Sequence, residues 1–528
     1  MIKNNILLAA ALFAAAGIAC IAAPVDVVTD DGFSAEDSPE LACTSILAGK
    51  NATVDGTLIT SHTCDGHYRT WFTMEPAADH PSGALHRIYK GTPKTSGPND
   101  TTALELVLTI PEAAHTYRYI NTGYPCLNEC NVAIGETTFG GPKALRNPDS
   151  PLMIEELERI ALQRCSTARD AVLMMGRTAE KYGYGDGGEC LTVADTREAW
   201  FFEIIGVGSK ARGAAWVAVR IPDDQVAVSA NIPRIGVVDR TDKANCLCSD
   251  NLEAVARKHG LWDGKKPFSF WRAFHDNYGD GRNYSYREFY ILSQLDPSLG
   301  LKWGMDELPR SVKPDEKVDV RRVFELLGST YEGTDWDVSR NMLFTDKDGT
   351  VKRNPAANPW ITADVINMLN SLKKGAAVSH RTPAVVWCAY SHVIQLDGSL
   401  PEGLGGICWM SVDNPAQSPR VPIFSGSTDV PSPYKLCGQE IYRPDCALWR
   451  FRRANRLALV RWTANKDSFL DERRALESES FRRLDSLKVS WSSNPGDLDK
   501  FTGDSYDRAV SKWDELEAKY WLSIWRGL

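Results

Sequence analysis

The residues best able to do chemistry together are a thiol, an imidazole and a carboxylate in one short stretch. Cys43 opens the first hydrophobic segment that could begin a folded domain, and His62 and Asp65 follow a turn at Asp55 and Gly56. A strand from Cys43, that turn and a return strand would form a β-hairpin, with the three groups at one end. A thiol becomes a nucleophile once a neighbouring base takes its proton. The spacing therefore predicts a cysteine-dependent hydrolase.

Cleavage of the chain just before Cys43 would add a base on the same residue. An α-amine titrates at about 7.7–8.0, against about 10.4 for lysine, so it can accept a proton at neutral pH. Nucleophile and base would then belong to one residue. The alternative for Cys43 is a disulfide, with Cys64 as the nearest partner, which an oxidising compartment permits.

Six motifs along the chain carry a resemblance to a known family. They are residues 43–56 (CTSILAGKNATVDG), 127–138 (LNECNVAIGETT), 195–204 (DTREAWFFEI), 228–236 (VSANIPRIG), 331–334 (YEGT) and 405–416 (GGICWMSVDNPA). In this order they resemble the dipeptidases of the cysteine N-terminal nucleophile (Ntn) hydrolases, relatives of penicillin V acylase and bile salt hydrolase. The resemblance spans roughly residues 43–435. It implies a four-layer αββα sandwich, small peptides as substrates and a reaction that needs no cofactor.

The resemblance also assigns a role to two residues of the hairpin. Asp65 matches the aspartate that helps to hold the α-amine of the nucleophile, and His62 stands where relatives carry an arginine. A histidine with a pKa near 6.5 does not hold a fixed charge as arginine does. His62 could instead polarise the thiol, or contact the substrate carboxylate when protonated. The alternative is a surface residue at the end of a strand.

Four further site residues follow from the same resemblance. Asn231 matches the asparagine that donates to the oxyanion, and its alternative is a turn residue before Pro233. Asn128 lies in a well-matched block, and Thr138 falls near the second oxyanion-hole position, where its hydroxyl or backbone could donate. Arg287 corresponds to the arginine held behind the nucleophile in acylase relatives, with a surface salt bridge as the alternative.

The N-terminal segment predicts export. Lys3 precedes an apolar, Ala-rich run over residues 6–23, which is typical of a cleaved signal segment over 1–23. We expect the protein in the periplasm or at the cell surface. Residues 17–20 loosely resemble a lipoprotein box, in which Cys20 would be acylated as a lipid anchor. Residues 24–42 are acidic and lack Lys and Arg, which indicates a propeptide or linker, or alternatively a simple tether.

The amino-acid composition limits the kinds of partner that the protein is expected to bind. A net charge of -8 provides no basic surface for nucleic acid. The close cysteine pairs, Cys126 with Cys130 and Cys246 with Cys248, suggest local bridges or a metal clip. Neither pair has the spacing of a zinc site, so we expect no metal.

The elements that must position these residues indicate an α+β protein. Short apolar runs between residues 104 and 139 predict strands, and residues 154–175 have the period of a helix or two. Further strands are expected around 191–193, 199–206, 214–220 and 226–231. Residues 446–462, 465–488 and 503–526 have helical spacing. The predicted domains are therefore an enzyme domain over 43–435 and a helical extension over 436–528, which packs on the sandwich or forms a homo-oligomer contact.

Three functions remain open on the sequence. A dipeptidase must bind two charged ends, which requires a polar, closed site, and this is the reading that the resemblance favours. An acylase-type C–N amide hydrolase needs an apolar slot for an acyl tail. The third reading is a non-catalytic surface protein that keeps the fold.

Overall fold

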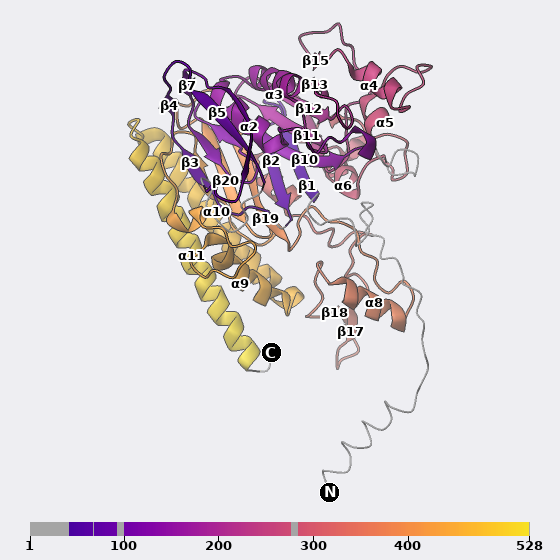
Figure 1. The fold of residues 1–528 in the computed structure, drawn as a ribbon. Helices are drawn as coiled ribbons and strands as arrows, with labels where there is room; N and C mark the ends of the chain where they lie inside the picture. The colour runs from indigo at the N-terminus through magenta and orange to yellow at the C-terminus, as the bar shows by residue number, and fades with distance from the viewer. Residues whose placement is uncertain (1–41, 67, 92–99, 276–282, 527–528) are drawn as a thin grey trace.

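The computed structural model describes residues 42–66, 68–91, 100–275 and 283–526 (Figure 1). The predicted signal segment with Cys20, and the acidic segment up to residue 41, lie outside the described residues. Within the described part of the chain, no helix combines the length and apolar character that crossing a bilayer requires.

Two antiparallel sheets form the centre of the molecule. The first has seven strands, in the spatial order β16 (Ser311–Val312), β14 (Val226–Ser229), β1 (Ala42–Ala48), β2 (Leu58–Asp65), β19 (Cys388–Leu396), β20 (Gly406–Val412) and β21 (Val421–Phe424). The second has eight, in the order β15 (Cys246–Cys248), β13 (Ala215–Ile221), β12 (Ala199–Ile205), β11 (Gly188–Ala194), β10 (Ala133–Gly140), β9 (Leu127–Asn128), β8 (Tyr119–Asn121) and β3 (Thr73–Glu75).

Helices cover the outer face of each sheet, and the inner faces pack together. On the eight-stranded sheet lie α2 (Ile154–Arg164) and α3 (Ala168–Tyr182), and on the seven-stranded sheet lie α6 (Tyr286–Leu295) and α7 (Val320–Leu327). Strands β1 and β2 face β10 and β11 across the interface between the sheets. The layers therefore run helix, sheet, sheet, helix (Figure 1).

The N-terminal hairpin forms as its sequence predicts. β1 and β2 pair antiparallel with Cys43 opposite Cys64, and the connection turns at Gly56, whose φ is +76°. Asp55 fixes this turn because its Oδ1 accepts hydrogen bonds from the backbone N–H and the hydroxyl of Thr57. Cys43, His62 and Asp65 consequently lie on two adjacent central strands.

Polar side chains and a glycine set the contact between the two sheets. The hydroxyls of Thr60 and Thr192 lie 2.7 Å apart across the interface. Gly135 on β10 lies so close to β2 that a Cβ atom there would collide with the backbone carbonyl of Ser61. The missing side chain therefore lets β10 approach β2 and brings the neighbouring Glu136 toward the hairpin.

Three C-terminal helices pack against the edge of the seven-stranded sheet. They are α9 (Ala447–Leu459), α10 (Trp462–Ser490) and α11 (Pro495–Trp525). Phe451, Phe469 and Trp513 join the same hydrophobic core as residues of β20 and β21. In Figure 1 these helices form the yellow layer beside the sheets.

The remaining elements are short. The helices are α4 (Leu252–Lys258), α5 (Phe270–Phe274) and α8 (Ala363–Leu372), with 3₁₀ turns at Lys143–Leu145, Pro297–Leu299 and Ser432–Lys435. Three small two-stranded sheets pair β4 (Ala78–Asp79) with β7 (His115–Thr116), β5 (Leu85–Lys90) with β6 (Glu105–Pro111), and β17 (Leu343–Thr345) with β18 (Val351–Arg353).

Candidate active site

The backbone of Cys43 is held on both sides. Its amide nitrogen donates to Asn231 Oδ1 at 2.9 Å, and its carbonyl oxygen accepts from Arg287 at 2.6 Å. Cys43 is the second residue of β1 and only 3% exposed. The nitrogen that would become an α-amine after cleavage before Cys43 therefore already has a fixed acceptor.

Asn231 lies just beyond the end of β14 in a left-handed conformation, with φ of +65°. Asparagine tolerates this region better than most residues. Its Oδ1 accepts from Cys43 and from Arg287, and its Nδ2 donates to the backbone oxygen of Thr138 at 2.6 Å. Asn231 thus connects β1, β10 and α6 around the nucleophile, and the alternative of a simple turn residue does not account for these contacts.

Arg287 is fully buried at the start of α6. The helix begins with a capping box, in which Ser285 and Glu288 satisfy each other's backbone N–H groups. From this rigid end the guanidinium donates to the Cys43 carbonyl, the Thr44 hydroxyl, the Ala230 carbonyl and Asn231 Oδ1. Arg287 therefore lies behind the nucleophile, where the resemblance places it, and not in a surface salt bridge.

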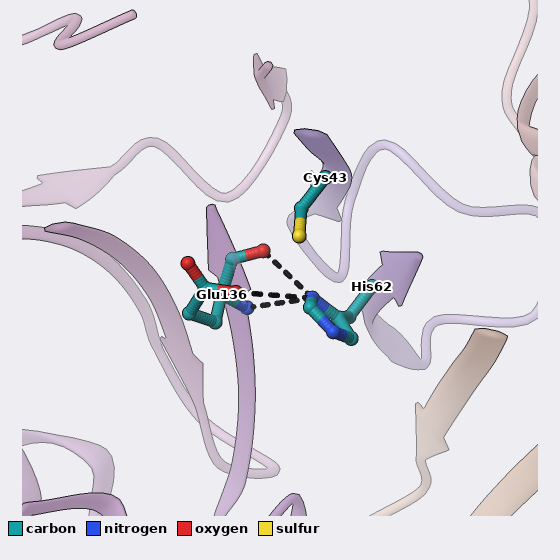
Figure 2. A group of neighbouring side chains, drawn as sticks. All are labelled: Cys43, His62 and Glu136. Atoms are coloured by element: carbon teal, nitrogen blue, oxygen red, sulfur yellow. Dashed lines mark hydrogen bonds and ion pairs between the residues drawn. The ribbon is translucent and has the colours of Figure 1, made fainter. Parts of the chain in front are cut away.

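The thiol of Cys43 lies beside an imidazole and a carboxylate. The Cys43 sulfur, a His62 ring nitrogen and a Glu136 carboxylate oxygen lie within 4.8 Å of one another, and Figure 2 shows the sulfur directed toward the other two side chains. Burial, followed by the Glu136 charge, raises the pKa of Cys43 well above its usual value. The thiol therefore stays protonated in this state and needs a base to react.

His62 is a buried, neutral ring. Its Nδ1 lies 2.7 Å from the backbone oxygen of Glu136, so a proton on Nδ1 is donated to that carbonyl. Tyr124, Tyr390 and His392 surround the ring at centroid distances of 5.3–5.7 Å. Burial lowers the pKa of His62 to about 4. His62 is therefore not a surface residue, and its low pKa disfavours the protonated ring that would contact a substrate carboxylate.

Asp65 forms a buried ion pair. Its Oδ2 accepts from Arg381 at 2.6 Å and from the Thr63 hydroxyl at 2.8 Å. The backbone N–H of Asp65 is directed at the Cys43 thiol, which lowers the pKa of Cys43 against the larger effect of burial. Arg381 thus places a buried positive charge next to Asp65.

The last two predicted residues differ in their placement. Thr138 lies at the site: its carbonyl accepts from Asn231, and its hydroxyl donates to Glu136 Oε1 at 3.0 Å. Asn128 is fully buried and donates to the carbonyls of Leu162 and Cys165 at the end of α2. Its side chain joins β9 to that helix, so substrate binding by Asn128 is not supported.

The described cysteines bear on both the predicted bridges and the question of metal binding. Cys43 and Cys64 face each other across the hairpin as free thiols, and Cys126, Cys130, Cys246 and Cys248 are free as well. Within the described ranges, only Cys43, His62 and Glu136 gather closely enough to hold a metal ion. Zinc accepts such donors, but His62 Nδ1 is engaged by a carbonyl and the thiol hydrogen-bonds to Glu136.

Three residues of the site were not predicted from the sequence. Glu136 and Glu189 are carboxyl groups in adjacent buried strands, and a charged residue inside an apolar strand was the available signal. Arg381 gave no such signal, because its partner Asp65 lies 316 residues away along the chain.

Comparison with known proteins places this site in a family. The model of peptidase family C69 matches residues 42–474. A probable dipeptidase of Latilactobacillus sakei is 24% identical over 82% of this chain and 85% of its own length, and a probable dipeptidase B of Streptococcus pyogenes serotype M1 is 24% identical over 91% and 93%. A probable dipeptidase of Salmonella dublin is 26% identical over 73% and 81%. These findings confirm the dipeptidase resemblance of the motifs: the chain belongs to peptidase family C69 and is a hydrolase of peptide bonds.

Proposed function

We propose that this protein is an exported dipeptidase whose nucleophile is the thiol of Cys43, exposed as the N-terminal residue when the preceding segment is removed. The observation that carries the proposal is the setting of Cys43. Its nitrogen is bound by Asn231, its carbonyl by Arg287, and its thiol lies beside Glu136 and His62. The names of the relatives support dipeptides as the substrates.

The layered arrangement supports an Ntn-hydrolase fold. Cys43 lies at the beginning of a central strand of one of two facing sheets, with helices on both outer faces. We assign the two sheets and their covering helices to the αββα sandwich on this basis.

Leader removal follows the same chemistry as substrate cleavage. The Cys43 sulfur attacks the carbonyl carbon of Ala42, a thioester forms, and the bond to the Cys43 nitrogen breaks, which frees the α-amine. Water then hydrolyses the thioester and releases the leader. The thiol has a raised pKa in this state, so it needs a base, and the freed amine provides one for every later turnover.

In the dipeptide reaction the α-amine takes the thiol proton and the sulfur attacks the scissile carbonyl carbon. A tetrahedral intermediate forms, the peptide C–N bond breaks with proton return to the leaving amine, and water releases the acyl residue. Asn231 is the candidate oxyanion donor: an amide NH₂ carries two hydrogens, and the hydrogen bond to the Thr138 carbonyl uses one. Asp65, paired with Arg381, holds the α-amine of Cys43.

The polar setting of the thiol favours a dipeptidase over an acylase. Carboxyl, imidazole and thiol groups lie close to the sulfur, and an acyl tail would require an apolar slot there. Penicillin V and conjugated bile acids should consequently be poor substrates. Export and a lipid anchor at Cys20 are also part of this proposal, and the N-terminal targeting segment alone supports them.

The test begins with the mature N-terminus. Mass measurement of the exported protein should show a chain that begins Cys-Thr-Ser-Ile-Leu. Cys43→Ala should abolish dipeptide hydrolysis and leave the thermal unfolding midpoint nearly unchanged, because it removes one small buried group. Cys64→Ala is the matched control, since Cys64 lies opposite Cys43 in the same hairpin. An active protein that begins near residue 24, or wild-type turnover by Cys43→Ala, would refute the mechanism.

A further inference from the structure

A pair of buried carboxyl groups lies beside the nucleophile, and the reaction described above gives them no role. Glu136 on β10 and Glu189 on β11 lie diagonally across the antiparallel pair, because Thr138 is the register partner of Glu189. Both side chains are buried and hydrogen-bond to each other. The Thr138 hydroxyl donates to Glu136 Oε1, which fixes the carboxyl plane.

The strongest influences on this pair come from neutral or acidic groups. The groups that act most strongly on Glu136 are Glu189, Thr138, Cys43 and Asp186, and none of them is a cation. Glu136 Oε2 is fully buried and has no hydrogen-bond partner among the described residues. A buried carboxylate is costly unless it is paired, so this site is suited to a ligand that brings a positive charge.

The chemistry of a dipeptide places such a charge at this point. The sulfur must come within about 3–3.5 Å of the scissile carbonyl carbon for attack. The substrate's α-ammonium nitrogen is separated from that carbon by one Cα atom, a distance of about 2.5 Å. The ammonium group must therefore lie within about 6 Å of the sulfur. A Glu136 carboxylate oxygen lies within 4.8 Å of the same sulfur.

We infer that Glu136, supported by Glu189, binds the α-ammonium group of the dipeptide and makes the enzyme specific for a free substrate N-terminus. This inference rests on the proposed function, since it assumes attack by Cys43. The nucleophile's own nitrogen is held elsewhere, on Asn231 Oδ1. Glu136 is consequently left for the substrate.

The pair carries one negative charge for one ammonium group. Burial and the neighbouring Glu136 raise the pKa of Glu189 well above its usual value, so Glu189 keeps its proton and donates it to Glu136. Burial raises the pKa of Glu136 to about 7. An arriving ammonium group favours the ionised form of Glu136 and completes the pair.

The experiment compares alanyl-alanine with lactoyl-alanine, in which a hydroxyl replaces the ammonium group at nearly constant size. A charge-assisted hydrogen bond predicts that kcat/KM is about ten- to a hundredfold higher for alanyl-alanine in the wild-type enzyme. Glu136→Gln should reduce this ratio to within about threefold, by loss of alanyl-alanine hydrolysis. Glu158→Gln is the matched control, because Glu158 is an equally buried carboxyl on α2, and it should keep the wild-type ratio.

Glu189→Gln should also keep a high ratio, because a neutral amide replaces a neutral carboxyl and still donates to Glu136. If Glu136→Gln does not fold, Glu136→Asp carries the same test: the shorter side chain withdraws the carboxylate and should lower the ratio. A wild-type ratio in Glu136→Asp would overturn the inference.

Three further outcomes separate this inference from the proposed function. Equal rates on both substrates, with Cys43→Ala inactive, would overturn ammonium recognition and leave the nucleophile intact. An equal loss on both substrates in Glu136→Gln would show that Glu136 acts on the thiol, which also overturns the inference. No hydrolysis of any dipeptide by the mature wild-type protein would refute the proposed function itself.

Discussion

The ion pair between Asp65 and Arg381 is the residue-scale feature with the largest expected effect on stability. Both side chains are buried, and the contact of 2.6 Å joins the end of β2 to the segment before β19. Removal of one partner leaves the other charge buried without compensation, which typically costs about 3–5 kcal/mol. Arg381→Met should therefore lower the free energy of unfolding by about that amount, measured by urea denaturation.

The matched control for this prediction is the double variant Asp65→Asn with Arg381→Met. It removes both charges together, so it should be more stable than Arg381→Met alone. A double variant that is less stable than either single variant would show that the pair does not account for the loss. Activity should be low in Arg381→Met, in Asp65→Asn and in the double variant, because Asp65 holds the nucleophile's amine in the proposed mechanism.

Residues close in sequence were easier to place than residues that meet through the fold. Cys43, His62 and Asp65 belong to one hairpin, and the turn at Asp55 and Gly56 was enough to predict it. The burial of His62 was not predicted, since the surrounding rings come from segments far along the chain. The distant Asn231 and Arg287 were indicated only by the family resemblance, whose assigned roles stay predictions.

At the scale of elements, the close approach of β10 to β2 decides where the carboxyl pair lies. Gly135→Ala would drive a methyl group into the backbone carbonyl of Ser61, which cannot move aside like a side chain. We expect a loss of about 1–3 kcal/mol in unfolding free energy. Activity should fall more steeply, because Glu136 is the next residue and would be displaced from the Cys43 thiol.

Gly503→Ala provides the control for that substitution. Gly503 lies inside α11, and nothing lies within 4 Å of the position its Cβ atom would take. Alanine in a helix interior is favoured over glycine by about 1 kcal/mol, so this variant should gain stability and keep activity. Wild-type activity in Gly135→Ala would show that sheet separation does not control the site.

Element prediction succeeded where the apolar period was long. The strands expected between residues 191 and 231 and the hairpin are present, and residues 154–175 form two helices, broken before Thr167, which caps α3. The last helix begins at Pro495, eight residues before the predicted start. Pro495 and Gly496 usually interrupt helices, but proline is well suited to the first helical position.

At the scale of the whole molecule, buried carboxyl groups make stability depend on pH. Burial raises the pKa of Glu136, Glu203 and Glu288 to about 7 and that of Asp186 to about 6. Between pH 4.5 and these values the folded state binds more protons than the unfolded chain, so stability falls as the pH rises. The loss is complete once the pH has passed the folded-state pKa values.

Two buried histidines oppose this trend at lower pH. Burial lowers the pKa of His62 to about 4 and that of His392 well below its usual value, so their contribution to stability rises between about pH 4 and 6.5. Above pH 6.5 the buried carboxyl groups outnumber the opposing group, the Cys248 thiol, whose pKa is lowered to about 6. We therefore expect a lower thermal unfolding midpoint at pH 8 than at pH 6.5, measured at constant ionic strength. Glu203→Gln should flatten the dependence, and an unfolding midpoint that rises with pH would contradict it.

The long-range contacts of the site determine when the chain becomes reactive. Cys43 is bound by residues 188 and 244 positions further along, and Asp65 by one 316 positions away. Each contact closes a long loop, whose entropy cost must be met before the contact stabilises anything. Nascent and partly folded chains therefore carry an ordinary, unassisted thiol. In the proposed mechanism, completion of the fold therefore sets when the chemistry begins, and a chain whose folding is incomplete does not cleave itself.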